Sequence, residues 1–261
     1  MASRLDYIKC APRRILDAGC GTGHGSRLLA ARYPDARIAC VDIARNMLTA
    51  GRGEAPWLKR HLPFLAGTAT DSVCADLQAL PLADGSIDLV WSNLALHWCD
   101  LDRAIAEAHR VLRNDGLLMF TTLGPDTLKE LRAVFAGLDD YPHVNRFIDM
   151  HDIGDALVRA GFADPVMDME MLTITVDDFA GLTRDLKATG VTNHLRDRRP
   201  GLLGKESWRQ AQARYQGLRR DGKLPVTVEV LYGHAWRPRA KVLADGQQVV
   251  EFRPYKRAPG A

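Results

Sequence analysis

A glycine-rich turn near the start of the chain is the feature with the clearest chemical meaning. Residues 17–23 read Asp-Ala-Gly-Cys-Gly-Thr-Gly, which starts with Asp17 and places glycines at three alternate positions, Gly19, Gly21 and Gly23. Glycine lets the backbone approach a ligand closely and adopt φ angles that a Cβ atom would disfavour. An apolar stretch, His24 to Arg32, follows at once and is typical of a helix. The turn therefore predicts a site for a nucleotide-like cofactor.

Polar side chains at the ends of the next apolar runs indicate how such a cofactor would be held. Asp42 ends the second run, nineteen positions after the last glycine of the turn, where a carboxylate can accept both hydroxyls of a ribose. Asp76 follows the third run and is placed to accept a hydrogen bond from an adenine amino group. Asn93 follows the fourth. The predicted cofactor-binding residues are Asp17, Gly19, Gly21, Gly23, Asp42, Ile43, Asp76, Leu77 and Asn93.

Other nucleotide sites fit the turn less well. The dinucleotide fingerprint needs glycine at its first, third and sixth positions, but the sixth is His24 counted from Gly19 and Ser26 counted from Gly21. The Gly-Lys-Ser/Thr ending of a phosphate loop is absent from the turn. Asp42 alone would also suit NAD, and an aspartate after a strand is often only a helix cap. The order and spacing of all these residues together favour a cofactor site.

The elements that must position these residues form an α/β pattern. Short apolar runs alternate with amphipathic stretches from Arg14 to Leu123, which predicts a mostly parallel sheet covered on both faces. A helix is predicted at Asp102–Leu112, and the alternation at Val226–Tyr232 predicts an antiparallel closing strand. The predicted strands before that are Ile15–Leu16, Arg37–Val41, Ser72–Ala75, Ile87–Ser92 and Leu117–Thr122.

The same pattern divides the chain into four predicted parts. Residues 1–123 form the cofactor-binding core, and residues 124–224 form a helical substrate-side insertion with one strand. Residues 225–236 supply the closing strand of the core sheet. Residues 237–261, with three prolines and several basic side chains, are predicted to be a partly mobile tail.

Composition excludes several classes of protein. The 261 residues carry 35 basic and 32 acidic side chains, so the net charge of +3 does not predict nucleic-acid binding. Five widely spaced cysteines without a C-x-x-C pair argue against a disulfide framework or a zinc site, and we predict no metal. The start lacks the apolar core of a signal peptide, and no run reaches about 18 apolar residues. We expect a cytoplasmic protein outside the membrane.

Taken together, the glycine turn, Asp42, Asp76 and the segment Leu112–Leu118 resemble the class I methyltransferase family. This resemblance implies S-adenosylmethionine as the cofactor. It also implies a Rossmann-like, seven-stranded sheet with an antiparallel last strand. Later segments resemble, more specifically, the biotin-pathway malonyl-[acyl-carrier protein] O-methyltransferase family: Leu94–Asp100, Leu123–Arg132, His143–Asp152 and Leu231–Trp236. That resemblance implies methylation of the free malonyl carboxylate on acyl carrier protein.

Such chemistry needs no general base, because a carboxylate is ionised at pH 7 and the sulfonium methyl group is already activated. A cation must orient the carboxylate, and a bidentate arginine suits this role. We favour Arg146 over Arg132 and Lys129, with an exposed surface charge as the alternative. His97 and Trp98 are predicted to line the methyl-transfer pocket, with core packing as the alternative for Trp98.

A strongly basic stretch predicts how the substrate protein would dock. Residues 184–223 contain eleven arginines and lysines against four acidic side chains, which suits an acidic acyl carrier protein. The alternative for any one of these residues is a solvated helix face. Only fourteen residues precede Ile15, fewer than is usual in the family, so we expect a short or missing lid over the cofactor.

Two other functions remain open at this point. Mitochondrial respiratory-complex assembly factors share the fold and hydroxylate an arginine of a partner. A non-catalytic protein that binds S-adenosylmethionine and acts as a scaffold is the third possibility. A methyl ester, an added oxygen atom or no product would distinguish the three.

Overall fold

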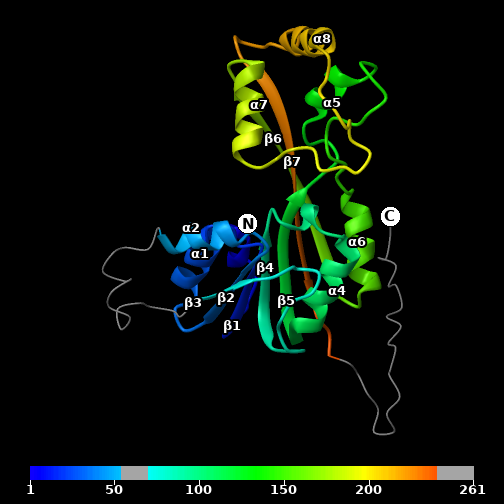
Figure 1. The fold of residues 1–261 in the computed structure, drawn as a ribbon. Coiled ribbons are helices and arrows are strands. Elements are labelled where there is room, and N and C mark those ends of the chain that lie inside the picture. Colours follow the sequence, from blue (N-terminus) through cyan, green and yellow to red (C-terminus); the bar gives the residue numbers. More distant parts are fainter. Residues whose placement is uncertain (54–69, 240–261) are drawn as a thin grey trace, which may run out of the picture.

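A seven-stranded sheet forms the centre of the computed structural model, which describes residues 1–53 and 70–239 (Figure 1). The strands lie in the order β3-β2-β1-β4-β5-β7-β6. Strands β3, β2, β1, β4 and β5 are parallel, and β7 is antiparallel to both β5 and β6. The strands are β1 Arg14–Ala18, β2 Arg37–Asp42, β3 Thr70–Cys74, β4 Ile87–Asn93, β5 Leu112–Leu123, β6 Ala163–Val176 and β7 Leu224–Trp236. The predicted fold class is confirmed.

Helices cover both faces of this sheet and form a separate group beyond one end of it (Figure 1). They are α1 His24–Arg32, α2 Arg45–Gly53, α4 Leu101–Val111, α5 Lys129–Phe135, α6 Met150–Arg159, α7 Phe179–Ala188 and α8 Lys205–Gln216. The described ranges also contain the short 3-10 helices η1 Ala2–Asp6 and η3 Leu96–Trp98. Helix α4 begins after Asp100, whose side chain caps it by accepting a hydrogen bond from the Arg103 backbone N–H at 3.2 Å.

Three apolar clusters stabilise the part of the chain that the structure describes. The cluster between the sheet and helices α4 and α6 includes Val90, Ile105 and Leu157. The cluster on the opposite face, beneath α1 and η1, includes Leu5 and Leu29. A third cluster packs helices α5, α7 and α8 against the far ends of β6 and β7, and its members include fully buried side chains, Phe179, Ala211 and Tyr215. Burial of large apolar side chains stabilises each cluster by the hydrophobic effect.

The N-terminal 3-10 helix packs on the sheet through a buried side chain, a cation–π contact and an ion pair. Leu5 of η1 is 1% exposed. The guanidinium of Arg4 lies 3.9 Å above the ring of Tyr232 on β7 and pairs with Asp168 on β6 at 2.5 Å. These contacts attach η1 to the antiparallel side of the sheet.

Several predicted boundaries need adjustment. Leu112 was predicted to end a helix, but it begins β5, which starts five residues earlier than expected and bulges opposite β4. The closing strand extends to Leu224–Trp236 and β6 spans 14 residues. The division into four parts stays a prediction, and most of the predicted tail lies outside the described residues. No helix within residues 1–53 and 70–239 is long and apolar enough to cross a membrane.

Candidate active site

The glycine turn lies at the carboxyl ends of β1 and β2 and is held by backbone hydrogen bonds. The N–H groups of Gly19 and Cys20 donate to the carbonyl of Val41 at 2.8 and 3.1 Å. Gly19, Gly21 and Gly23 all adopt left-handed φ angles, of +75°, +54° and +80°. A Cβ on Gly19 would lie 2.2 Å from the Ala95 Cβ, whereas a Cβ on Gly21 would meet no atom within 4 Å. Gly19 therefore permits a close internal contact, and Gly21 borders open space.

Asp17 lies beneath the turn and is almost fully enclosed, with 2% of its surface exposed. It accepts a 2.5 Å hydrogen bond from the Ser26 hydroxyl on helix α1. Burial disfavours the ionised form and raises the pKa of Asp17 to about 6, against the opposing effect of the Ser26 hydrogen bonds. A Cβ on Gly25 would come within 3.0 Å of this carboxylate and 3.1 Å of the Trp91 Nε1 atom. Asp17 thus anchors the turn to the first turn of the following helix.

The two predicted cofactor acids lie in different local settings. Asp42 accepts hydrogen bonds from the N–H groups of Gly21 and Ala44, each at 2.8 Å, through separate carboxylate oxygens. Each of these oxygens keeps acceptor capacity for a further donor. Both carboxylate oxygens of Asp76 accept from the Gln78 side-chain amide, at 3.1 and 3.2 Å. Sequence reasoning did not identify Gln78 as a partner of Asp76.

The surroundings of Gly21 and Asp42 fit the predicted cofactor, S-adenosylmethionine. The open side of Gly21 leaves room for a ligand next to a carboxylate that already touches the same glycine. Ile43, which follows Asp42, is 70% exposed, whereas Leu77, which follows Asp76, is 9% exposed. An exposed apolar side chain beside a carboxylate suits the flat face of a base and the hydroxyls of its ribose. Within the described ranges, no group of three or more His, Cys, Asp or Glu residues could hold a metal ion.

The fourth predicted position, Asn93, ends strand β4 at the same edge of the sheet. Its side-chain oxygen accepts a 2.9 Å hydrogen bond from the Thr121 hydroxyl on β5. The Thr121 hydroxyl in turn accepts from the Leu94 N–H at 3.0 Å, and Leu94 has a left-handed φ of +52°. Two strands thereby fix the backbone where the chain turns toward η3. Asn93 itself, the last residue of the strand, is exposed.

His97 and Trp98 form η3 directly after this turn. Desolvation by burial lowers the pKa of His97 to about 4, so its ring is neutral at pH 7. The His97 Nδ1 atom is buried and has no hydrogen-bond partner among the described residues. The Trp98 side chain is 46% exposed, which contradicts its alternative interpretation as a core residue. The two rings lie 5.0 Å apart.

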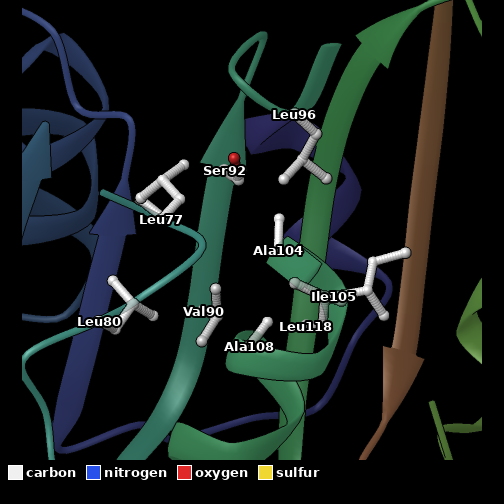
Figure 2. Close-up of a pocket in the computed structure, with 10 residues that line it drawn as sticks. Leu77, Leu80, Val90, Ser92, Leu96, Ala104, Ile105, Ala108 and Leu118 are labelled. Atoms are coloured by element: carbon white, nitrogen blue, oxygen red, sulfur yellow. The ribbon is translucent and has the colours of Figure 1, made fainter. Parts of the chain in front are cut away.

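A small apolar cavity lies in the core beneath this region (Figure 2). Its walls include Leu77, Leu80 and Leu96, and the Ser92 hydroxyl lies at its edge, buried and without a partner among the described residues. Its volume of about 10 Å³ is close to the space that one water molecule needs. This cavity is therefore a packing gap between the sheet and α4, too small to be a cofactor site.

The three cations considered for the substrate carboxylate differ in their surroundings. Arg146 has a 71% exposed side chain and pairs with Asp197 at 2.6 Å. Arg132 donates to the backbone carbonyls of Pro125 and Thr127, at 3.0 and 3.3 Å. Lys129 pairs with its neighbour Asp126 at 2.9 Å. Arg132 is therefore engaged by its own loop, and Arg146 keeps its role as a prediction.

Comparison with known proteins identifies the family. A methyltransferase domain family matches residues 16–120, which include the glycine turn. The chain is 56% identical over 259 residues to the malonyl-[acyl-carrier protein] O-methyltransferase of Laribacter hongkongensis, covering 98% of this chain and 87% of the relative. The chain belongs to the malonyl-[acyl-carrier protein] O-methyltransferase family. A relative of the same name from Gallionella capsiferriformans is 54% identical and covers 96% of this chain and 86% of its own length.

Membership of the malonyl-[acyl-carrier protein] O-methyltransferase family confirms the resemblance seen in the sequence and makes the chain a methyltransferase. Solved structures share the fold. YcgJ from Bacillus subtilis superposes with a TM-score of 0.63 at 14% identity, covering 91% of this chain and 97% of YcgJ. Geranyl diphosphate C-methyltransferase from Streptomyces coelicolor, solved with S-adenosyl-L-homocysteine, gives 0.53 at 16% identity and covers 90% and 78%.

Proposed function

We propose that this chain transfers the methyl group of S-adenosylmethionine to the free carboxylate of malonyl-[acyl-carrier protein], an early step of biotin biosynthesis. The observation that carries this proposal is the 54–56% identity, over nearly the whole chain, to two enzymes named for that substrate. Both names describe methyl transfer, which favours this function over an arginine-hydroxylating assembly factor or a scaffold. The five free cysteines suit the reducing cytoplasm in which we place the enzyme.

The residues at the carboxyl edge of the sheet would hold the cofactor. Asp42 would accept the ribose hydroxyls, and Ile43 and Leu77 would enclose the adenine. Asp76 would accept from the adenine amino group with the acceptor capacity that Gln78 leaves free. The glycine turn would lie along the remainder of the cofactor, and Asn93 would lie at the end that carries the methyl group. When bound, S-adenosylmethionine supplies a methyl group that its sulfonium charge makes electrophilic.

The protein then contributes orientation and exclusion of water. A malonyl carboxylate is ionised at pH 7 and attacks through its own oxygen, so no side chain has to remove a proton. His97 suits a role in orienting the substrate, because its low pKa keeps it neutral and its Nδ1 atom has no hydrogen-bond partner among the described residues. Arg146 is our candidate for the cation that receives the carboxylate, in exchange for part of its contact with Asp197. In-line positioning then lowers the barrier to transfer.

A basic surface on the helical part of the chain would receive the acidic carrier protein. Many of the basic side chains in residues 184–223 are engaged internally, as in the pairs Arg199–Asp139 and Lys223–Asp177. Others have no side-chain partner among the described residues: Arg184, Lys187, Arg196, Lys205 and Arg220. These cations are available for long-range attraction, which should weaken as salt rises.

The test is a transfer reaction with the purified protein, labelled S-adenosylmethionine and malonyl-[acyl-carrier protein]. We expect a base-labile label on the carrier protein, because a carboxyl methyl ester is cleaved by mild base. Carrier protein without the malonyl group is the control and should stay unlabelled. A folded, cofactor-bound protein that transfers no label would refute the proposal, and an added oxygen atom on a partner arginine would support the assembly factor instead.

A further inference from the structure

Three segments that are far apart in the sequence meet at the aromatic residues of η3. His97 lies 5.0 Å from the Trp98 ring and 6.0 Å from the Phe147 ring, in an edge-to-face arrangement. His194 also contacts Trp98 edge to face, with ring centroids 5.2 Å apart and an interplanar angle of 80°. Aromatic rings at these distances and angles attract each other. The four rings form an aromatic cluster that begins four residues after Asn93.

The position of His194 depends on a clamp made by Asn145. The Asn145 side-chain nitrogen donates to the Thr192 carbonyl at 3.0 Å, and its oxygen accepts from the His194 N–H at 3.0 Å. One amide side chain thereby satisfies two backbone groups of the segment that carries His194. The neighbouring Asn193 donates to the Pro142 carbonyl at 2.6 Å. These contacts fix the backbone on both sides of His194.

Two ion pairs extend the same attachment. Asp197 pairs with Arg146 at 2.6 Å, and Arg199 pairs with Asp139 at 2.9 Å. Residues 191–203 contain neither helix nor strand, so their conformation depends on side-chain contacts of this kind. The contacts connect residues 192–199 of this segment with residues 139–146. Together these contacts place the exposed His194 against Trp98, whose side chain is also partly exposed.

The free ring atoms of the cluster suit an acyl thioester. The His194 Nε2 atom lies 2.9 Å from the Thr192 hydroxyl, and Nδ1 has no hydrogen-bond partner among the described residues. If the Thr192 hydroxyl donates to Nε2, then Nδ1 carries the proton and can donate to a carbonyl oxygen. Trp98 and Phe147 offer flat apolar surfaces for the carbon chain of the substrate. The cluster thus combines apolar faces with hydrogen-bonding edges next to the predicted methyl-transfer position.

We propose that His194 is a substrate-binding residue, which donates a hydrogen bond from Nδ1 to the thioester carbonyl of the malonyl group, and that the Asn145 clamp holds it in place. This inference rests on the proposed function and names a second wall of the same site. It assigns a catalytic part to the segment around His194, which lies in the helical part of the chain and not in the cofactor-binding core.

The test compares three substitutions of His194 in the transfer assay. An asparagine amide can replace the Nδ1 donor, whereas a glutamine amide lies closer to the position of Nε2. We expect His194→Ala and His194→Gln to raise the KM for malonyl-[acyl-carrier protein] about tenfold, the effect of one lost hydrogen bond. His194→Asn should recover most of this loss. His151→Ala, on the exposed start of α6, is the matched control and should behave as the wild type.

Measurements of cofactor affinity and of the thermal unfolding temperature distinguish a loss of substrate binding from a loss of folding in each variant. The dissociation constant for S-adenosylmethionine should stay unchanged in all four variants. A wild-type KM in His194→Ala would overturn the inference and leave the proposed function intact. Equal losses in the Ala, Asn and Gln variants, with a lower unfolding temperature, would show that His194 only packs and would also overturn it. Absence of transfer by the wild type would refute the proposed function itself.

Discussion

Replacing Gly19 or Gly21 by alanine tests how the glycine turn works. Both residues have left-handed φ angles, which cost an alanine about 1–2 kcal/mol. Only at Gly19 does the new Cβ also collide with a neighbour, since it would lie 2.2 Å from the Ala95 Cβ. Overpacking of a core typically adds about 1–3 kcal/mol. We therefore expect Gly19→Ala to lower the free energy of unfolding by about 2–5 kcal/mol, and Gly21→Ala by about 1–2 kcal/mol.

Cofactor binding should separate the two variants in a different way. The Cβ of Gly21→Ala would occupy the open space that we assign to S-adenosylmethionine, so its affinity should fall at least about tenfold in a protein that stays folded. Urea unfolding measures the free energy of unfolding, and isothermal titration calorimetry measures the cofactor affinity. Equal unfolding free energies for the two variants would refute the steric role of Gly19. Unchanged cofactor affinity in Gly21→Ala would refute the position of the ligand.

Three further changes test other parts of the account. Burial raises the pKa of Asp17 to about 6, so its contribution to stability is complete below about pH 4 and is lost as the pH rises through about 6. Asp17→Asn should therefore flatten the fall in the free energy of unfolding over this pH range, measured with urea. An unchanged slope would contradict the assigned pKa. Asp42→Asn should raise the dissociation constant for S-adenosylmethionine about tenfold or more, by calorimetry, while Asp71→Asn on the exposed edge of β3 should leave it unchanged. Tyr215→Phe removes the hydroxyl that donates to the Pro225 carbonyl at 2.8 Å within the third apolar cluster. This change should lower the free energy of unfolding by about 1 kcal/mol. An unchanged free energy would mean that this hydrogen bond does not stabilise the fold.

Local patterns explain why much of the fold and the cofactor site could be predicted. The apolar runs and the glycine turn are patterns of a few residues each. They therefore predict the strands, the helices and the edge of the sheet where Asp42 and Asp76 lie. Boundaries were less certain, because Leu112 suits the end of a helix as well as the start of a strand. Side-chain partners close in sequence were also missed, as with the Gln78 amide that binds Asp76.

The substrate side depends on contacts that no local pattern reveals. Asn145 and His194 are 49 residues apart, and neither lies in a helix or strand. Their pairing follows from how residues 139–147 and 191–199 pack on each other. The exposure of Arg146 and its pairing with Asp197 have the same origin. The sequence could therefore name Arg146, His97 and Trp98 as candidates, but not His194, whose ring contacts that of Trp98.

The most direct test of the central claim compares malonyl and acetyl thioesters on the same acyl carrier protein. Both carry the same prosthetic arm and protein surface, and only the malonyl group ends in a free carboxylate. Intact-protein mass spectrometry after incubation with S-adenosylmethionine should show one added methyl group on the malonyl form and none on the acetyl form. Methylation of both forms, or of neither by a protein that binds the cofactor, would contradict carboxyl methyl transfer.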